Sequence, residues 1–221
     1  MTSRTTTLPI FPLSLVLFPG MTLPLHVFEE RYKRMIGLCI RENHDFGVVL
    51  AGAPMAVPGQ CFTHPVGTTA HISGATRFPD GCMNLITTGE QRFQILSLDW
   101  ELAYCVAQVE WLPEPLSDAA TVRDQAARRW NAFRRLIADM TNADCVTADL
   151  PGDPTEASYA LAASLPVSDF EKQRLLEATD ATARLRETMR LINREYGLLR
   201  YLSEPHAEAI QPDEDSAVLP N

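Results

Sequence analysis

The stretch LPIFPLSLVLFPGMTLPLHVFEERYKRMI, residues 8–36, decides which fold this chain can adopt. It is strongly apolar, yet it contains Pro9, Pro12, Pro19 and Pro24. Each proline disfavours a helical conformation in the residue before it and removes a backbone donor. The stretch is therefore expected to form short extended strands, placed at sheet edges, at bulges or at barrel corners.

Two further signals lie within this stretch. Residues 18–21, Phe-Pro-Gly-Met, suit a type II turn, with proline at the second position and glycine at the third. After Phe28 the apolar residues recur at three- and four-residue spacing, which is typical of a surface helix, and this helix is expected to end near Asn43. Residues 46–50, FGVVL, then read as a buried strand.

The same prolines argue against an export signal and against a membrane span. A secretory signal needs a basic start and an unbroken apolar helix, but only Arg4 precedes the run. A transmembrane helix needs about 20 consecutive apolar residues, and here the prolines, His26, Glu29 and Glu30 interrupt the stretch. We expect a soluble, cytoplasmic protein that does not enter a membrane.

The composition excludes several classes of protein. The chain has 221 residues, of which 46% are hydrophobic and 21% charged, as in an ordinary globular protein of one or two packed units. Its net charge of −9 would repel a phosphate backbone, so nucleic acid is not an expected partner. The five cysteines include no CxxC pair, and the five histidines form neither HExxH nor H-x-x-x-H. We expect no disulfide framework, no metal and no cofactor.

Residues 51–62, AGAPMAVPGQCF, have neither a helical nor a strand period and are expected to form a loop that exposes Met55 and Val57. Phe62 follows at the end of the loop, and Phe78 lies beside a turn. An adaptable apolar surface of this kind suits loose binding of unfolded chain. The alternative is that these side chains fold back onto the rim of the barrel.

The chain is expected to have two subdomains. Strand-like segments at short intervals favour a β-barrel or sandwich before Leu112, and helical patterns follow it. We therefore divide the chain into a flexible N-terminus at 1–7, a β-barrel subdomain at 8–112, a helical subdomain at 113–201 and an acidic, disordered tail at 202–221.

Three helix boundaries in the second half have clear sequence signals. Asp153 is an expected N-cap with Pro154 at the first helical position. Ser168 and Glu171 have the spacing of a capping box. The last helix is expected to run from about residue 180 to 196, with Gly197 as its C-terminal cap.

The opening stretch resembles the signature at the start of the amino-terminal, substrate-binding domain of Lon proteases. Three later segments agree with that family in the same order. They are VGTTAHI at 66–72, GEQRFQIL at 89–96 and LPVSDFEKQRLLEATDATARL at 165–185. The resemblance covers residues 8–197.

The resemblance implies an α+β fold, in which a PUA-like β pseudo-barrel with one inserted helix is followed by an α-helical bundle. It also implies binding of unfolded or tagged protein segments rather than chemistry. No G-x-x-x-x-G-K-[ST] motif is present and the Ser-Lys proteolytic domain is missing, so the chain looks like a free-standing relative of one Lon domain. The motif residues to which the resemblance gives structural roles are Pro19 and Gly20 in the turn, His26, Phe28, Arg31 and Tyr32 between strand and helix, and Gly67, Arg92 and Phe93 in later strands.

Three hypotheses for function follow. The leading one is a non-enzymatic, bacterial-type module without catalytic residues that binds extended or apolar polypeptide in a groove where the barrel meets the helices. Its expected contacts are Met55, Val57, Phe62 and Phe78, and a separate protease or chaperone is a further candidate partner. The second is RNA binding through the PUA-like barrel, which needs a basic face with stacking aromatics. The third is a small-molecule or thiol enzyme that uses Cys61 near His64.

Overall fold

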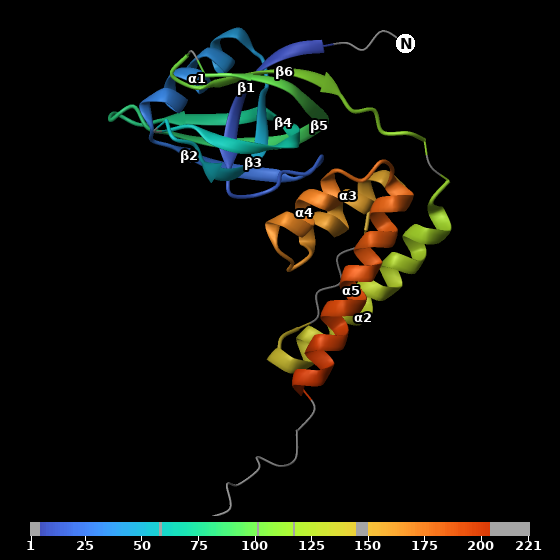
Figure 1. Ribbon diagram of the computed structural model, residues 1–221. Coiled ribbons are helices and arrows are strands. Elements are labelled where there is room, and N and C mark those ends of the chain that lie inside the picture. The colour runs from blue at the N-terminus through green and yellow to red at the C-terminus, as the bar shows by residue number, and fades with distance from the viewer. Residues whose placement is uncertain (1–4, 58, 101, 117, 145–149, 204–221) are drawn as a thin grey trace, which may run out of the picture.

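The computed structural model describes residues 5–57, 59–100, 102–116, 118–144 and 150–203. It has a six-stranded sheet with one helix among the strands, followed by four helices (Figure 1), and this confirms the predicted α+β class. In chain order the elements are β1 (Thr5–Leu13), β2 (Thr22–Val27), α1 (Glu30–Glu42), β3 (Phe46–Pro54), β4 (Cys61–Arg77), β5 (Met83–Asp99), β6 (Cys105–Trp111), α2 (Ala120–Thr141), α3 (Pro154–Ser164), α4 (Asp169–Leu176) and α5 (Ala181–Ser203).

The sheet closes on itself. Its strand order is β2-β5-β4-β3-β1-β6, and β5 pairs with β6 as well, so five strands form a ring. Strand β2 pairs with residues 83–88 of β5 and adds Leu23 and Val27 to the core. The β1–β3 pair is parallel and the other pairs are antiparallel. Full closure removes most free strand edges, which is how a small barrel avoids edge-to-edge association.

Three of the four prolines of the opening stretch, Pro9, Pro12 and Pro24, lie in strands at positions that pair with one neighbouring strand. Pro9 of β1 pairs with Val106 of β6, whereas Pro12 pairs with Val49 of β3. Along β1 the hydrogen-bonding partner thus changes from β6 to β3. Each proline lies at a position where a missing N–H is tolerated. Pro24 lies in β2, which pairs with β5 alone among the described strands.

Residues 18–21 form the expected turn. Gly20 has a φ of 79°, and the Met21 amide donates to the Phe18 carbonyl at 3.0 Å, as a type II turn requires. The turn is fixed to β5, because the Gly20 amide donates to the Gly89 carbonyl at 2.8 Å and the Gly89 amide donates to the Met21 carbonyl at 2.9 Å. A tight turn therefore lies against the middle of a long strand.

Two boundaries at the N-terminal side differ from the sequence expectation. The flexible N-terminus predicted for residues 1–7 is wrong for Thr5, Thr6 and Thr7, which pair with β6 from Glu110 to Gln108. The loop predicted at 51–62 is shorter, because β3 continues to Pro54 and β4 begins at Cys61. A register shift between Ala51 and Pro54 lets this irregular sequence stay in the sheet.

The C-terminal helix is longer than expected. Gly197 was predicted to cap it, but α5 continues to Ser203 and Gly197 does not have a positive φ. Leu199, beyond the glycine, packs against a buried cluster. This packing outweighs the roughly 1 kcal/mol that a glycine costs inside a helix, so the prediction of a C-cap at Gly197 is wrong. The tail predicted at 202–221 lies outside the described residues from 204 onwards.

The caps of α3 and α4 are confirmed. Asp153 accepts from the amides of Thr155 and Glu156 at 2.9 Å each, and Pro154 begins the helix. Ser168 and Glu171 form the reciprocal capping box at the start of α4. These caps fix where the two helices begin, and Figure 1 shows α3 and α4 between the barrel and the α2–α5 pair.

The barrel and the helices share a hydrophobic core. Phe18 and Val66 from the barrel belong to one buried cluster with Phe133 of α2, Tyr159 of α3 and Leu175 of α4. A separate cluster fills the barrel beneath α1. No helix within the described part of the chain has the length and apolarity that a membrane span requires.

Candidate functional site

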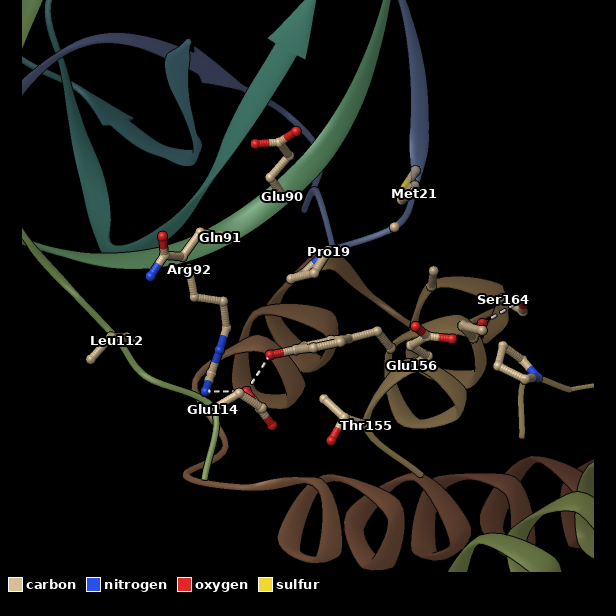
Figure 2. A pocket seen from close by; sticks show the side chains of 15 residues that line it. Pro19, Met21, Glu90, Gln91, Arg92, Leu112, Glu114, Thr155, Glu156 and Ser164 are labelled. Atoms are coloured by element: carbon tan, nitrogen blue, oxygen red, sulfur yellow. Dashed lines mark hydrogen bonds and ion pairs between the residues drawn. The ribbon is translucent and has the colours of Figure 1, made fainter. Parts of the chain in front are cut away.

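A cleft of about 760 Å³ lies where the barrel meets the helices, and we call it the junction cleft (Figure 2). One wall comes from the 18–21 turn and from β5, and the facing wall comes from α3. Its lining residues are Pro19, Gly20, Met21, Glu90, Gln91, Arg92, Leu112, Glu114, Pro151, Thr155, Glu156, Tyr159, Ala160, Ala163 and Ser164. Most of them are apolar or small, as is usual in binding clefts.

Arg92 connects the two walls. Its side chain leaves β5, is 4% exposed, and donates from Nη1 to the carbonyls of Leu176 and Ala178 at 2.6 and 2.7 Å. Its Nη2 donates to Glu114 at 2.7 Å. One barrel residue is thereby bound both to the C-terminal end of α4 and to the linker that leads into the helices.

Glu114 is the centre of a buried polar network, which we call the Glu114 network. Its carboxylate accepts from Arg92, from the Tyr159 hydroxyl at 2.5 Å, and from Arg184 of α5 at 3.1 and 3.3 Å. Arg184 is fully buried and its guanidinium lies 3.8 Å from the centre of the Tyr159 ring. Burial raises the pKa of Tyr159, so its hydroxyl stays protonated and continues to donate. The network holds β5, the linker, α3 and α5 in one arrangement.

Three of the motif residues expected to be structural line this cleft. Pro19 and Gly20 supply the turn and Arg92 supplies the connection between the walls. Phe93, next to Arg92, is fully buried and lies against the backbone of Gly67. A Cβ atom placed on Gly67 would lie 2.6 Å from the Phe93 ring, so only glycine fits there.

The residues expected between strand and helix have different environments. Tyr32 is buried and stacks on Phe11, with 4.1 Å between ring centres. His26 shares a hydrogen bond of 2.7 Å with the side chain of Asn84. Phe28 is 62% exposed, and its ring centre lies 6.1 Å from that of His26. Tyr32 is therefore the member of this set that packs the helix against the barrel.

The four expected peptide contacts lie away from the junction cleft. Met55, Val57, Phe62 and Phe78 are all exposed, and none of them belongs to the cleft lining.

Two loops beside α1 carry three of these four side chains. Arg31 of α1 donates to the Gly59 carbonyl and so holds the loop that carries Met55 and Val57. Lys33 of α1 donates to the Asp80 carbonyl at 3.4 Å in the turn that follows Phe78. The apolar side chains are thus presented to solvent by loops fixed to α1.

Sequence reasoning missed Glu114 and Tyr159, which build the polar network of the cleft. Glu114 lies between two prolines at the start of the segment assigned to the helical subdomain, and for the helix that carries Tyr159 only the N-terminal cap was predicted. The partners of Glu114 are 22, 45 and 70 residues away. The one available signal was Pro113-Glu114-Pro115 itself, because prolines on both sides restrict the backbone that carries the carboxylate.

The structure offers no support for a thiol nucleophile at Cys61. Residues three apart in a strand lie on opposite faces, and Cys61 and His64 are both in β4. Burial raises the pKa of Cys61, which disfavours the reactive thiolate. Within the described part of the chain, no three side chains of the metal-binding types come together as a metal site.

We predict that the four cysteines in the described part of the chain react slowly with thiol reagents at neutral pH. Burial raises the pKa of Cys39 and Cys105 to about 12 and that of Cys61 and Cys82 above its ordinary value, so little thiolate forms. Labelling of the folded protein, followed by mass spectrometry of its peptides, should give rates below that of free cysteine and a rise with pH. Fast labelling of Cys61 alone would instead support the thiol enzyme.

Comparisons with known proteins identify the family of this chain. The family model of the ATP-dependent protease La (LON) substrate-binding domain matches residues 7–194. The chain is 29% identical over 199 residues to the Lon protease of Anaeromyxobacter dehalogenans, and 27% identical over 203 residues to that of Escherichia coli. Each match covers 87% of this chain but only 24% or 25% of the relative. The chain thus spans about a quarter of the length of these proteases.

Solved structures show the same fold. A Lon N-terminal domain protein from Xanthomonas campestris superimposes with a TM-score of 0.60 at 25% identity, covering 84% of this chain and 98% of that one. The N-terminal domain of a Mycobacterium avium complex Lon protease gives a TM-score of 0.63 at 19% identity, with 85% and 98% covered. This chain belongs to the family of Lon substrate-binding domains.

Proposed function

We propose that this chain binds polypeptide segments in the junction cleft and carries out no chemistry there. The observation that supports this most strongly is the cleft itself, a cavity of about 760 Å³ with largely apolar walls, contributed by both subdomains. Its central polar groups are already engaged with one another in the Glu114 network. Such a site offers contact area to apolar side chains, while the groups of the Glu114 network are occupied with one another.

The charges of the cleft favour protein over RNA as the ligand. Among the described residues that line it, Arg92 is the only cation, and its guanidinium is already paired with Glu114. Binding of single-stranded nucleic acid relies on free cations along a groove. A polypeptide segment can bind without free cations in the cleft.

The proposal also names the clients, the partner that receives them and the cellular compartment. The clients would be unfolded or exposed segments of other proteins, and a separate protease or chaperone would receive them. We place the protein in the cytoplasm, because all four described cysteines are free thiols, as suits a reducing compartment.

Binding can be measured by fluorescence anisotropy. Labelled lysozyme that is reduced and blocked with iodoacetamide is permanently unfolded, and native lysozyme is its folded counterpart of similar charge. We expect salt-tolerant binding of the unfolded form, weaker binding of the native form, and no binding of a short single-stranded RNA. Equal affinity for native and unfolded lysozyme would contradict the proposal, and salt-sensitive RNA binding would favour the RNA hypothesis.

A cleft-filling substitution tests where binding occurs. Ala160 of α3 lines the cleft, so Ala160→Trp should place an indole in the binding space and weaken binding of the unfolded chain by about tenfold, which is about 1.4 kcal/mol. Ala132→Trp on the exposed side of α2 is the matched control and should leave affinity unchanged. Unchanged affinity in Ala160→Trp would exclude the cleft and direct attention to Met55 and Val57.

A further inference from the structure

We infer that the first half of β1 binds an extended polypeptide segment as an added strand. This inference goes beyond the proposed function, because the site lies on the barrel and shares no lining residue with the junction cleft. Figure 1 shows the start of β1 at the end of the barrel away from the α2–α5 pair. An unpaired strand edge and a cavity along that edge carry the inference.

Strand β1 has a free edge in its first half. Residues 5–10 pair with β6, whereas residues 10–13 pair with β3 on the other side. Residues 5–9 therefore face no second strand among the described elements, and their ladder with β6 is regular. The later part of β4 is also unpaired on one side, but a register shift between Ile72 and Gly74 interrupts it. The edge of β1 is the one of these two that a further strand can extend without a break.

The prolines indicate which backbone groups point to this open side. Successive residues of a strand direct their N–H and C=O groups to opposite sides, and proline is tolerated where the missing N–H would have no partner. Pro12 pairs with β3 alone, so its missing N–H belongs on the β6 side. Pro9 pairs with β6 alone, so its missing N–H belongs on the open side. The two assignments agree, and Thr5 and Thr7 direct their amides and carbonyls to the open side as well.

The open side thus presents a short row of unpaired backbone groups. It consists of the amides and carbonyls of Thr5 and Thr7 and the carbonyl of Pro9. Outside the ladders, these groups take part in no backbone hydrogen bond within the described part of the chain. Donors and acceptors that recur at every second residue match the backbone of another extended strand, which is how strand addition provides affinity.

A cavity of about 510 Å³ lies along this edge. Leu8, Pro9 and Trp111 give it apolar surface, and residues 43–45, which connect α1 to β3, form part of its lining. Every second side chain of a strand points to the same face, so alternate residues of an added strand would enter the cavity. The site therefore suits an extended segment with apolar side chains at alternate positions.

The test is an NMR titration of isotope-labelled protein with two seven-residue peptides. One is Gly-Val-Thr-Val-Thr-Val-Gly, and the other has the same sequence with every amide between the glycines N-methylated. The first peptide should slow hydrogen exchange at the Thr7 amide and bind about tenfold more tightly than the methylated one, because methylation removes the donors that strand addition needs.

Two substitutions at one position assign binding to the backbone of β1. Thr7→Pro removes the N–H that faces the open side and should weaken binding of the first peptide by about tenfold. Thr7→Ala is the matched control, since it keeps the amide and should bind like the parent protein. Both variants should unfold at the urea concentration of the parent. Loss of folding in Thr7→Pro would show that this N–H belongs to the β6 ladder and would overturn the assignment.

The outcomes separate this inference from the proposed function. Ala160→Trp fills the junction cleft and should bind the first peptide like the parent protein, whereas weaker binding would place the peptide in that cleft instead. Equal affinity for the two peptides, or unchanged exchange at Thr7, would overturn the inference and leave the proposed function intact. Protection of Thr7 that rises with protein concentration alone would also overturn it, because a second copy of the chain would then occupy the edge.

Discussion

Replacing Glu114 with glutamine is expected to lower the free energy of unfolding by about 3–5 kcal/mol, the usual cost of breaking a buried ion pair by removing one partner. Glutamine keeps the shape of the side chain but removes the one negative charge that Arg92 and Arg184 share. These guanidiniums are 4% and 0% exposed, so they stay largely out of contact with water when the carboxylate is lost. The large effect comes from leaving two buried cations uncompensated rather than from the intrinsic strength of the ion pairs.

Urea unfolding followed by tryptophan fluorescence and by circular dichroism measures this loss. Asp118→Asn, which removes an exposed carboxylate four residues along the chain, is the control and should change the free energy of unfolding by no more than about 0.5 kcal/mol. A similarly small effect for Glu114→Gln would contradict the idea that the network joins the subdomains. If Glu114→Gln is too unstable to purify, Tyr159→Phe, which removes one hydrogen bond to Glu114, should still unfold at lower urea than the parent protein.

The parts of the fold that could be predicted depend on local chemistry. The 18–21 turn needs only a proline followed by a glycine, α1 needs only its apolar spacing, and the caps of α3 and α4 involve residues within three positions of each other. Each of these signals is complete within a short window. Gly197 failed as a C-cap because the packing of Leu199, a tertiary contact, decided where α5 ends.

A groove between the barrel and the helices was expected, but the residues that form the junction cleft could not be predicted in the same way. Its walls are separated along the chain, and the carboxylate of Glu114 finds Arg184 70 residues later. The family resemblance did mark Pro19, Gly20 and Arg92 as structural residues, but it did not indicate that they line the cleft. The exposure expected for Met55 and Val57 is present, yet their loop is held beside α1 and contributes nothing to the lining of the cleft.

The second large effect is expected from Gly89→Ala. Gly89 is buried in β5, and a Cβ atom there would lie 2.3 Å from the Phe18 carbonyl oxygen and 3.1 Å from the Leu17 side chain. The nearest atom is backbone, so no side-chain rotation can relieve the overlap, and the 18–21 turn must move. We expect a loss of about 3 kcal/mol, at the upper end of the usual cost of overpacking.

Gly74→Ala is the matched control, because Gly74 is also a strand glycine but its added Cβ would lie 3.9 Å from the nearest atom, in Ile86. It should change the free energy of unfolding by less than about 1 kcal/mol in either direction. Gly89→Ala carries a second expectation, since the amide and carbonyl of Gly89 hold the turn that forms one wall of the junction cleft. Affinity for unfolded lysozyme, measured where the variant is still folded, should fall in Gly89→Ala and not in Gly74→Ala. Normal affinity in a destabilised Gly89→Ala protein would mean that the position of the turn matters for the fold and not for binding.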